Sequence, residues 1–166
     1  MPAGRGSHSR MPGSLPFPRG PARASREEER VVKKILLGGV AIFVAWEILG
    51  ALVHRVILGT TYASVPNIFR SPAELKMVLL AIVTPLGALA FAAVYACFVS
   101  PKSPAAGVKV GVVWGFGAGV MMGYGSFGSM PIPYVMALVW FLGTWLEFTV
   151  AGLLAGLIVK PVAART

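Results

Sequence analysis

The 166-residue chain is 56% hydrophobic and only 13% charged, with a formal net charge of +9 and a mean hydropathy of +0.75. From Ile35 onward it has only seven Lys or Arg residues and three acids. Typical soluble domains have about a quarter of their residues charged, so this chain lacks the polar surface of a water-soluble fold. The composition therefore excludes an ordinary soluble domain and predicts an all-α integral membrane protein.

Residues 1–30 are rich in Pro, Gly, Ser and Arg and have few apolar side chains. Such a segment buries too little surface to offset its ordering entropy, so we expect a disordered basic N-terminal tail. Eight of the fifteen basic residues precede Ile35 and so lie next to the first apolar run, where basic clusters commonly face anionic lipid. No recognisable nucleic-acid-binding module accompanies them, and we expect no nucleic acid as a partner.

Four apolar segments follow, each long enough to cross about 30 Å of hydrocarbon. The first is too long for a signal peptide and contains Glu47, so we interpret it as a retained helix. Ser71, Pro72 and Glu74 form a capping signal before the second segment. The sequence predicts a four-transmembrane-helix bundle over residues 31–166, with helices at about 35–58, 75–99, 107–124 and 134–159.

The basic residues are distributed unequally between the two ends of these helices. Twelve fall in the tail, the second loop and the C-terminus, whereas only Arg55, Arg70 and Lys76 fall on the opposite side. Cytoplasmic loops carry an excess of Lys and Arg, so we expect both termini in the cytoplasm, with a bacterial inner (plasma) membrane as the default location. Aromatic residues would form a belt at the outer interface: Tyr62, Phe69, Tyr124, Phe127 and Tyr134.

The third segment has a glycine at every fourth position, and the fourth segment adds two more. These glycines are Gly107, Gly111, Gly115, Gly119, Gly123, Gly152 and Gly156. A stripe of small residues lets two membrane helices approach closely. We expect it to serve packing within the bundle, with a homo-oligomer interface as the less favoured alternative.

Two acids fall inside predicted spans at matched depth. Glu47 is thirteen residues beyond Lys34, and Glu147 is thirteen residues before Lys160, which puts each about 20 Å from the cytoplasmic end. An ionised carboxylate is costly at that depth. We therefore expect the two side chains to face the bundle interior and to meet there.

Three further polar residues extend this hypothesis. His54 is two helical turns beyond Glu47, Thr144 is three residues before Glu147, and Thr84 precedes Pro85 at a predicted kink in the second helix. Together the five side chains could form a polar track for protons or cations. The alternative is that the carboxyls are neutral and only join helices by hydrogen bonds.

No catalytic motif accompanies these residues. The chain has no Ser/His/Asp set, no paired cysteines and no HExxH motif, and we expect neither a cofactor nor a metal. The prediction is a non-enzymatic accessory or scaffold component that lies in the lipid bilayer, alone, as a homo-oligomer or in a larger membrane complex. The alternative function is a proton- or cation-linked transporter or channel that uses Glu47, His54 and Glu147.

Overall fold

The computed structural model describes residues 21–159, and that part of the chain is helical without strands. The elements in chain order are α1 (Pro21–Ala51), the π-helical turn η1 (Leu52–Ile57), α2 (Gly59–Ala63), the 3-10 turn η2 (Pro72–Glu74), α3 (Met77–Phe98), α4 (Pro104–Val120), the π-helical turn η3 (Met121–Gly125), α5 (Ser126–Ser129) and α6 (Tyr134–Ile158). Four continuous helical stretches are long and apolar enough to cross a membrane, at Ser25–Ile57, Met77–Phe98, Pro104–Ser129 and Tyr134–Ile158. These findings confirm the all-α class and the four long apolar helices.

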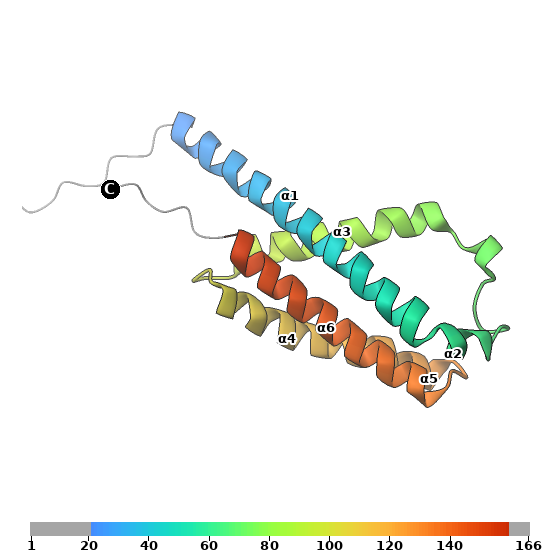
Figure 1. Ribbon diagram of the computed structural model, residues 1–166. Helices are drawn as coiled ribbons and strands as arrows, with labels where there is room; N and C mark the ends of the chain where they lie inside the picture. The colour runs from blue at the N-terminus through green and yellow to red at the C-terminus, as the bar shows by residue number, and fades with distance from the viewer. Residues whose placement is uncertain (1–20, 160–166) are drawn as a thin grey trace, which may run out of the picture.

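The first helix begins earlier than the predicted start at about residue 35. It starts at Pro21, inside the segment assigned to a disordered tail, while residues 1–20 lie outside the described residues. The composition of residues 21–34 explains the difference, because Ala, Arg, Glu and Lys are all strong helix formers. Glu29 and Lys33 are also spaced for an i,i+4 pair. Figure 1 shows the start of α1 projecting beyond the other helices.

The long helices pack in the order α4, α6, α1 and α3, and α3 also contacts α6. α4 lies along α6, α6 lies against α1, and α1 crosses α3, which reaches α6 with only part of its length (Figure 1). The start of α1 and the end of α6 lie at the same end of the body, beside the loop between α3 and α4. We call this the α3–α4 loop end. The opposite end, where η1, α2 and α5 lie, is called the α2 end.

The glycine ladder forms the contact between α4 and α6. Gly107, Gly111, Gly115 and Gly119 of α4 are buried, and a Cβ atom at Gly107 would collide with the carbonyl oxygen of Gly152. At the other end of the ladder, a Cβ atom at Gly123 would lie 2.9 Å from the Cβ of Phe141. The ladder therefore brings two backbones of the same chain together.

Two hydrophobic clusters hold these helices together. Towards the α3–α4 loop end, Ile42 of α1, Ala92 and Tyr95 of α3, and Ala155 of α6 are fully buried. The Tyr95 hydroxyl donates to the Ser103 carbonyl (2.9 Å) and accepts from the Ser103 N–H (3.0 Å). These two bonds fix the loop that joins α3 to α4.

The second cluster lies at the α2 end. Its buried members are Val53, Leu58, Ile132, Met136, Ala137 and Trp140. Two of the predicted belt residues cover it, since Tyr62 and Phe69 are in edge-to-face contact at 5.1 Å between ring centroids.

The capping signal before the second span does not start α3. Ser71 and Glu74 do form a capping box, in which the Ser71 N–H and hydroxyl both donate to one Glu74 carboxylate oxygen. That box caps the separate turn η2, and α3 begins only at Met77. The prediction was wrong because Leu75 is extended and breaks the helix between the two elements.

Candidate functional site

One face of α3 changes from buried to exposed along its length. In residues 88–98, Ala88, Phe91, Ala92 and Tyr95 are at most 7% exposed. Spacings of three and four residues continue this stripe to Thr84, Ala81, Leu80 and Met77, yet Leu80 is 49% and Met77 60% exposed. We call residues 77–83 the free half of α3 and residues 88–98 its packed half. The free half therefore leaves the body of the protein.

The separation begins at Gly87 and Pro85. The Trp46 ring lies against Gly87, where a Cβ atom would be 3.5 Å from the indole. Proline commonly kinks a helix, and Pro85 lacks the N–H that would bond to the Ala81 carbonyl. The Thr84 hydroxyl donates to the neighbouring Leu80 carbonyl at 3.2 Å. Figure 1 shows α3 diverging from α1 towards the α2 end.

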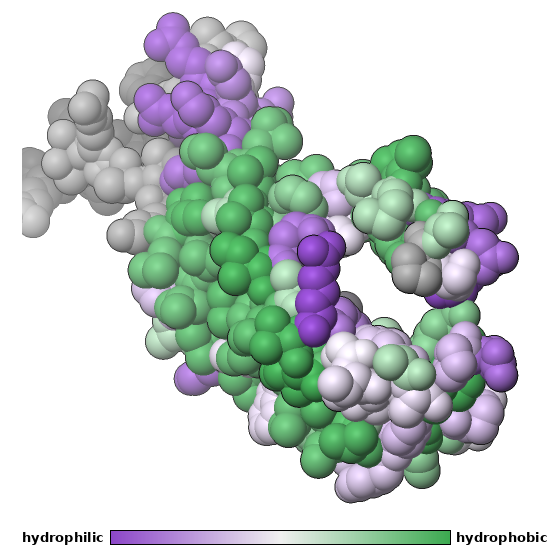
Figure 2. Space-filling model, turned by 45° about the vertical axis from the view of Figure 1, so that its right-hand side comes forward, coloured by the Kyte–Doolittle hydropathy of each residue, from purple (hydrophilic) through white to green (hydrophobic). Residues whose placement is uncertain are grey.

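The divergence opens a cleft between α1 with η1 on one side and the free half of α3 on the other. We call it the α1–α3 cleft. Figure 2 shows it as a hollow with hydrophilic atoms at its edge. Gly39, Phe43 and Glu47 follow each other at a spacing of four on α1, and Gly39 already lies against Leu89 of α3. Glu47 therefore lies on the side of α1 that turns towards α3.

Glu47 is exposed, so the expectation that it would be buried in the bundle is wrong. The α3 turn that would cover this side of α1 belongs to the diverging half of the helix. Among the described residues Glu47 has no hydrogen-bond or ion-pair partner. The two acids predicted to meet are therefore not joined to each other.

Glu147 is partly buried where α6 crosses α1. Its Oε1 lies 3.8 Å from the position of a Cβ atom on Gly50, and its backbone carbonyl accepts a 2.9 Å hydrogen bond from the Trp46 indole N–H. The glycine on α1 leaves room for the carboxyl group, while the tryptophan fixes the crossing.

A small cavity next to Glu147 brings together three of the predicted polar residues. Its volume is about 20 Å³, and it is lined by Val53, His54, Met122, Trp140, Gly143, Thr144 and Glu147. That is room for about one water molecule. Thr84, bonded to its own helix, and the exposed Glu47 do not line it.

A hydrogen-bonded chain connects this cavity to α2. The Trp140 indole N–H donates to the Tyr62 hydroxyl (3.0 Å), which lies 2.7 Å from His54 Nδ1. With the oxygen already accepting from Trp140, the tyrosine can donate its proton to an unprotonated Nδ1. Burial raises the pKa of Tyr62, partly opposed by the Trp140 hydrogen bond. Tyr62 was predicted only as a member of the aromatic belt, because no local pattern links it to a tryptophan 78 positions away.

The described residues do not contain a group of three or more His, Cys, Asp or Glu side chains that could hold a metal ion. Their chemistry is that of a helical protein with four helices long and apolar enough to span a membrane, and with a cleft that combines apolar and polar walls. The chain matches no family model, no curated protein and no solved structure.

Proposed function

We propose that the chain is an integral membrane protein that acts as a non-enzymatic accessory or scaffold component, and that the α1–α3 cleft is the surface through which it acts. The observation that carries this proposal is the α3 stripe that is buried at Ala88 and Phe91 but exposed at Leu80 and Met77. A stripe suited to packing is left uncovered, so another component of the membrane can occupy it.

The packed half of α3 supports an accessory role over conduction. Phe148 of α6 lies between Trp46 and Phe91, with ring centroids 5.2 Å and 5.6 Å away. Together with the buried residues around Tyr95, these rings fill the space between the cleft and the α3–α4 loop end. The cleft is therefore closed towards that end, whereas a single-chain channel needs a hydrated path across the whole membrane.

We further propose that both termini face the cytoplasm of a bacterial cell and that the location is the inner membrane. Lys33 and Lys34, which directly precede the apolar part of α1, and Lys102 and Lys109, near the α3–α4 loop, support this orientation by the positive-inside rule. Helical spans support the inner membrane, since outer-membrane proteins are typically β-barrels.

Membrane insertion is tested by alkaline extraction of cell membranes, and orientation by reporter fusions to the C-terminus. We expect the chain in the alkali-resistant pellet, with a fluorescent-protein fusion active and an alkaline-phosphatase fusion inactive. Release into the soluble fraction would contradict membrane insertion, and an active phosphatase fusion would contradict the orientation alone.

A second candidate function is proton or cation passage. It is favoured by the cavity that brings His54, Thr144 and Glu147 together. Purified protein in liposomes with an imposed pH gradient separates the two functions. The accessory role predicts proton flux equal to that of protein-free liposomes. Flux that Glu147→Gln abolishes, and that Glu47→Gln outside the cavity leaves largely intact, would favour passage instead.

A further inference from the structure

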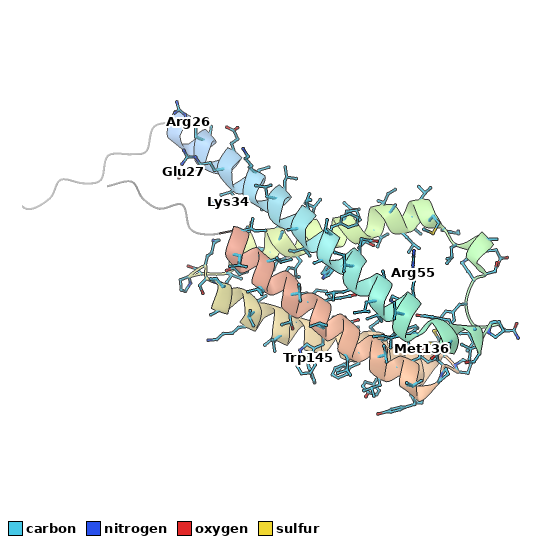
Figure 3. The ribbon with its side chains drawn as sticks, viewed as in Figure 1. Arg26, Glu27, Lys34, Arg55, Met136 and Trp145 are labelled. Carbon is cyan, nitrogen blue, oxygen red and sulfur yellow. The ribbon has the colours of Figure 1, made fainter. Side chains whose placement is uncertain are left out.

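Arg55 is a cation at the cleft that has no partner among the residues the structure describes. It is exposed on η1 and forms neither a hydrogen bond nor an ion pair with residues 21–159. Figure 3 shows its side chain extending from the end of the first span towards the free half of α3. A guanidinium group has five donors, so this one is available to a ligand in the cleft.

The position of Arg55 along the helix matches the level of lipid phosphates. It lies two residues before Ile57, where the first apolar span ends, and two residues correspond to about 3 Å. Arginine at such a site extends its head group into the polar layer while its stem stays in the apolar region. Glu47 lies eight residues earlier, about 12 Å deeper, and so does not compete for a phosphate at Arg55.

The opposite wall of the cleft is apolar. Met77 and Leu80 are 60% and 49% exposed on the stripe that faces the body, and Leu79, on the other side of the helix, is 54% exposed. Apolar side chains are exposed on both sides of the free half, so contact with hydrocarbon on both sides is favourable in a bilayer. The cleft therefore combines a phosphate-binding group at its mouth with a surface for acyl chains along its wall.

We propose that the α1–α3 cleft binds one phospholipid of the bilayer, with the phosphate on Arg55 and an acyl chain along Met77, Leu80 and Ala81. Arginine binds phosphate oxygens through paired, charge-assisted hydrogen bonds. This inference rests on the proposed membrane location, and it deepens the proposed function by naming the membrane component in the cleft.

The test is native mass spectrometry of the full chain, purified in mild detergent, stripped of lipid and titrated with dioleoyl phosphatidylglycerol or with dioleoylglycerol, which lacks the phosphate. We expect one phosphatidylglycerol per chain, bound about tenfold or more tightly than dioleoylglycerol. Arg55→Gln removes that preference. Arg70→Gln, which makes the same charge change at an exposed loop position, preserves it.

A second pair of variants tests the acyl-chain wall. Ala81→Trp fills the cleft and lowers lipid occupancy, whereas Leu79→Trp on the other side of the free half leaves it unchanged. Circular dichroism of every variant establishes that the helices are retained, and Arg55→Lys, which keeps the charge but not the paired bonds, should bind with intermediate affinity.

Several results would overturn the inference while leaving membrane insertion intact. These are equal binding of the two lipids by the wild type, equal loss in Arg55→Gln and Arg70→Gln, or a protein chain in place of lipid in the spectrum. Release of the protein from membranes by alkaline extraction would instead overturn the proposed membrane function itself.

Discussion

Adding one methyl group at Gly111 should destabilise the protein relative to the same addition at Gly117. Both residues lie in α4, but on different faces. A Cβ atom at Gly111 would collide with the Phe148 carbonyl and lie 2.9 Å from the Thr149 Cα, whereas a Cβ atom at Gly117 would meet nothing within 4 Å. At Gly111 the obstacle is backbone of α6, which cannot rotate away as a side chain could.

The magnitude follows from two opposing contributions. Replacing Gly by Ala inside a helix stabilises it by about 0.5–1 kcal/mol, and this gain applies to both variants. Overpacking a close contact costs about 1–3 kcal/mol, and this cost applies only to Gly111→Ala. The helix-propensity gain cancels in the comparison, so the two free energies of unfolding should differ by about 1–3 kcal/mol.

The assay is reversible unfolding of each variant in mixed detergent micelles, followed by circular dichroism as the denaturing detergent is increased. We expect Gly117→Ala at or above the wild-type stability and Gly111→Ala clearly below Gly117→Ala. Stabilities of the two variants within about 0.5 kcal/mol of each other, the usual range for neutral surface changes, would refute the close α4–α6 contact.

Two further predictions concern tyrosines. Tyr95→Phe leaves the partly buried Ser103 N–H without its partner, and the Ser103 carbonyl keeps only the bond from the Gly107 N–H. This change should lower the unfolding free energy by about 1–3 kcal/mol. The exposed Tyr134→Phe should change it by less than about 0.5 kcal/mol, and equal losses in the same unfolding assay would count against the Tyr95–Ser103 bonds. Burial raises the pKa of Tyr62 above its ordinary 10.0. The contribution of this tyrosine to stability is therefore complete below pH 10.0 and is lost as the pH rises through the higher folded-state pKa. Ultraviolet titration of the wild type, compared with Tyr62→Phe, measures that pKa. Trp140→Phe should raise that pKa further, and a phenol that ionises below 10.0 would contradict the burial.

Much of the helical architecture was predictable because it depends on local pattern. The apolar lengths predicted four spans, and the observed bounds Met77–Phe98 and Tyr134–Ile158 differ from the predicted 75–99 and 134–159 by at most two residues. The spacing of the glycines predicted a close helix contact, and the structure assigns that contact to α6. The start of α1 was missed because helix-forming residues 21–30 were judged together with the Pro- and Gly-rich residues before them.

The arrangement of the site was less predictable because it depends on where a whole helix goes. Proline in α3 indicated a kink at Thr84-Pro85, but no sequence pattern gives the direction in which the free half turns. That direction determines that Glu47 is exposed, while Glu147 is partly buried beside Gly50. Residue counts give the depth of Glu47 and Glu147 along their helices, but they do not give the face that each helix turns towards its neighbours.

The most direct test of the account is the accessibility of the α3 stripe in a lipid bilayer. A spin label at Leu80, in a variant whose single cysteine Cys97 is replaced by alanine, reports collisions with oxygen dissolved in the hydrocarbon. The open cleft predicts that the label at Leu80 contacts hydrocarbon and is as accessible to oxygen as a label at Leu79, on the other side of the helix. A label at Leu80 that is immobile and shielded, beside an accessible one at Leu79, would show the free half packed against the body and would contradict the cleft.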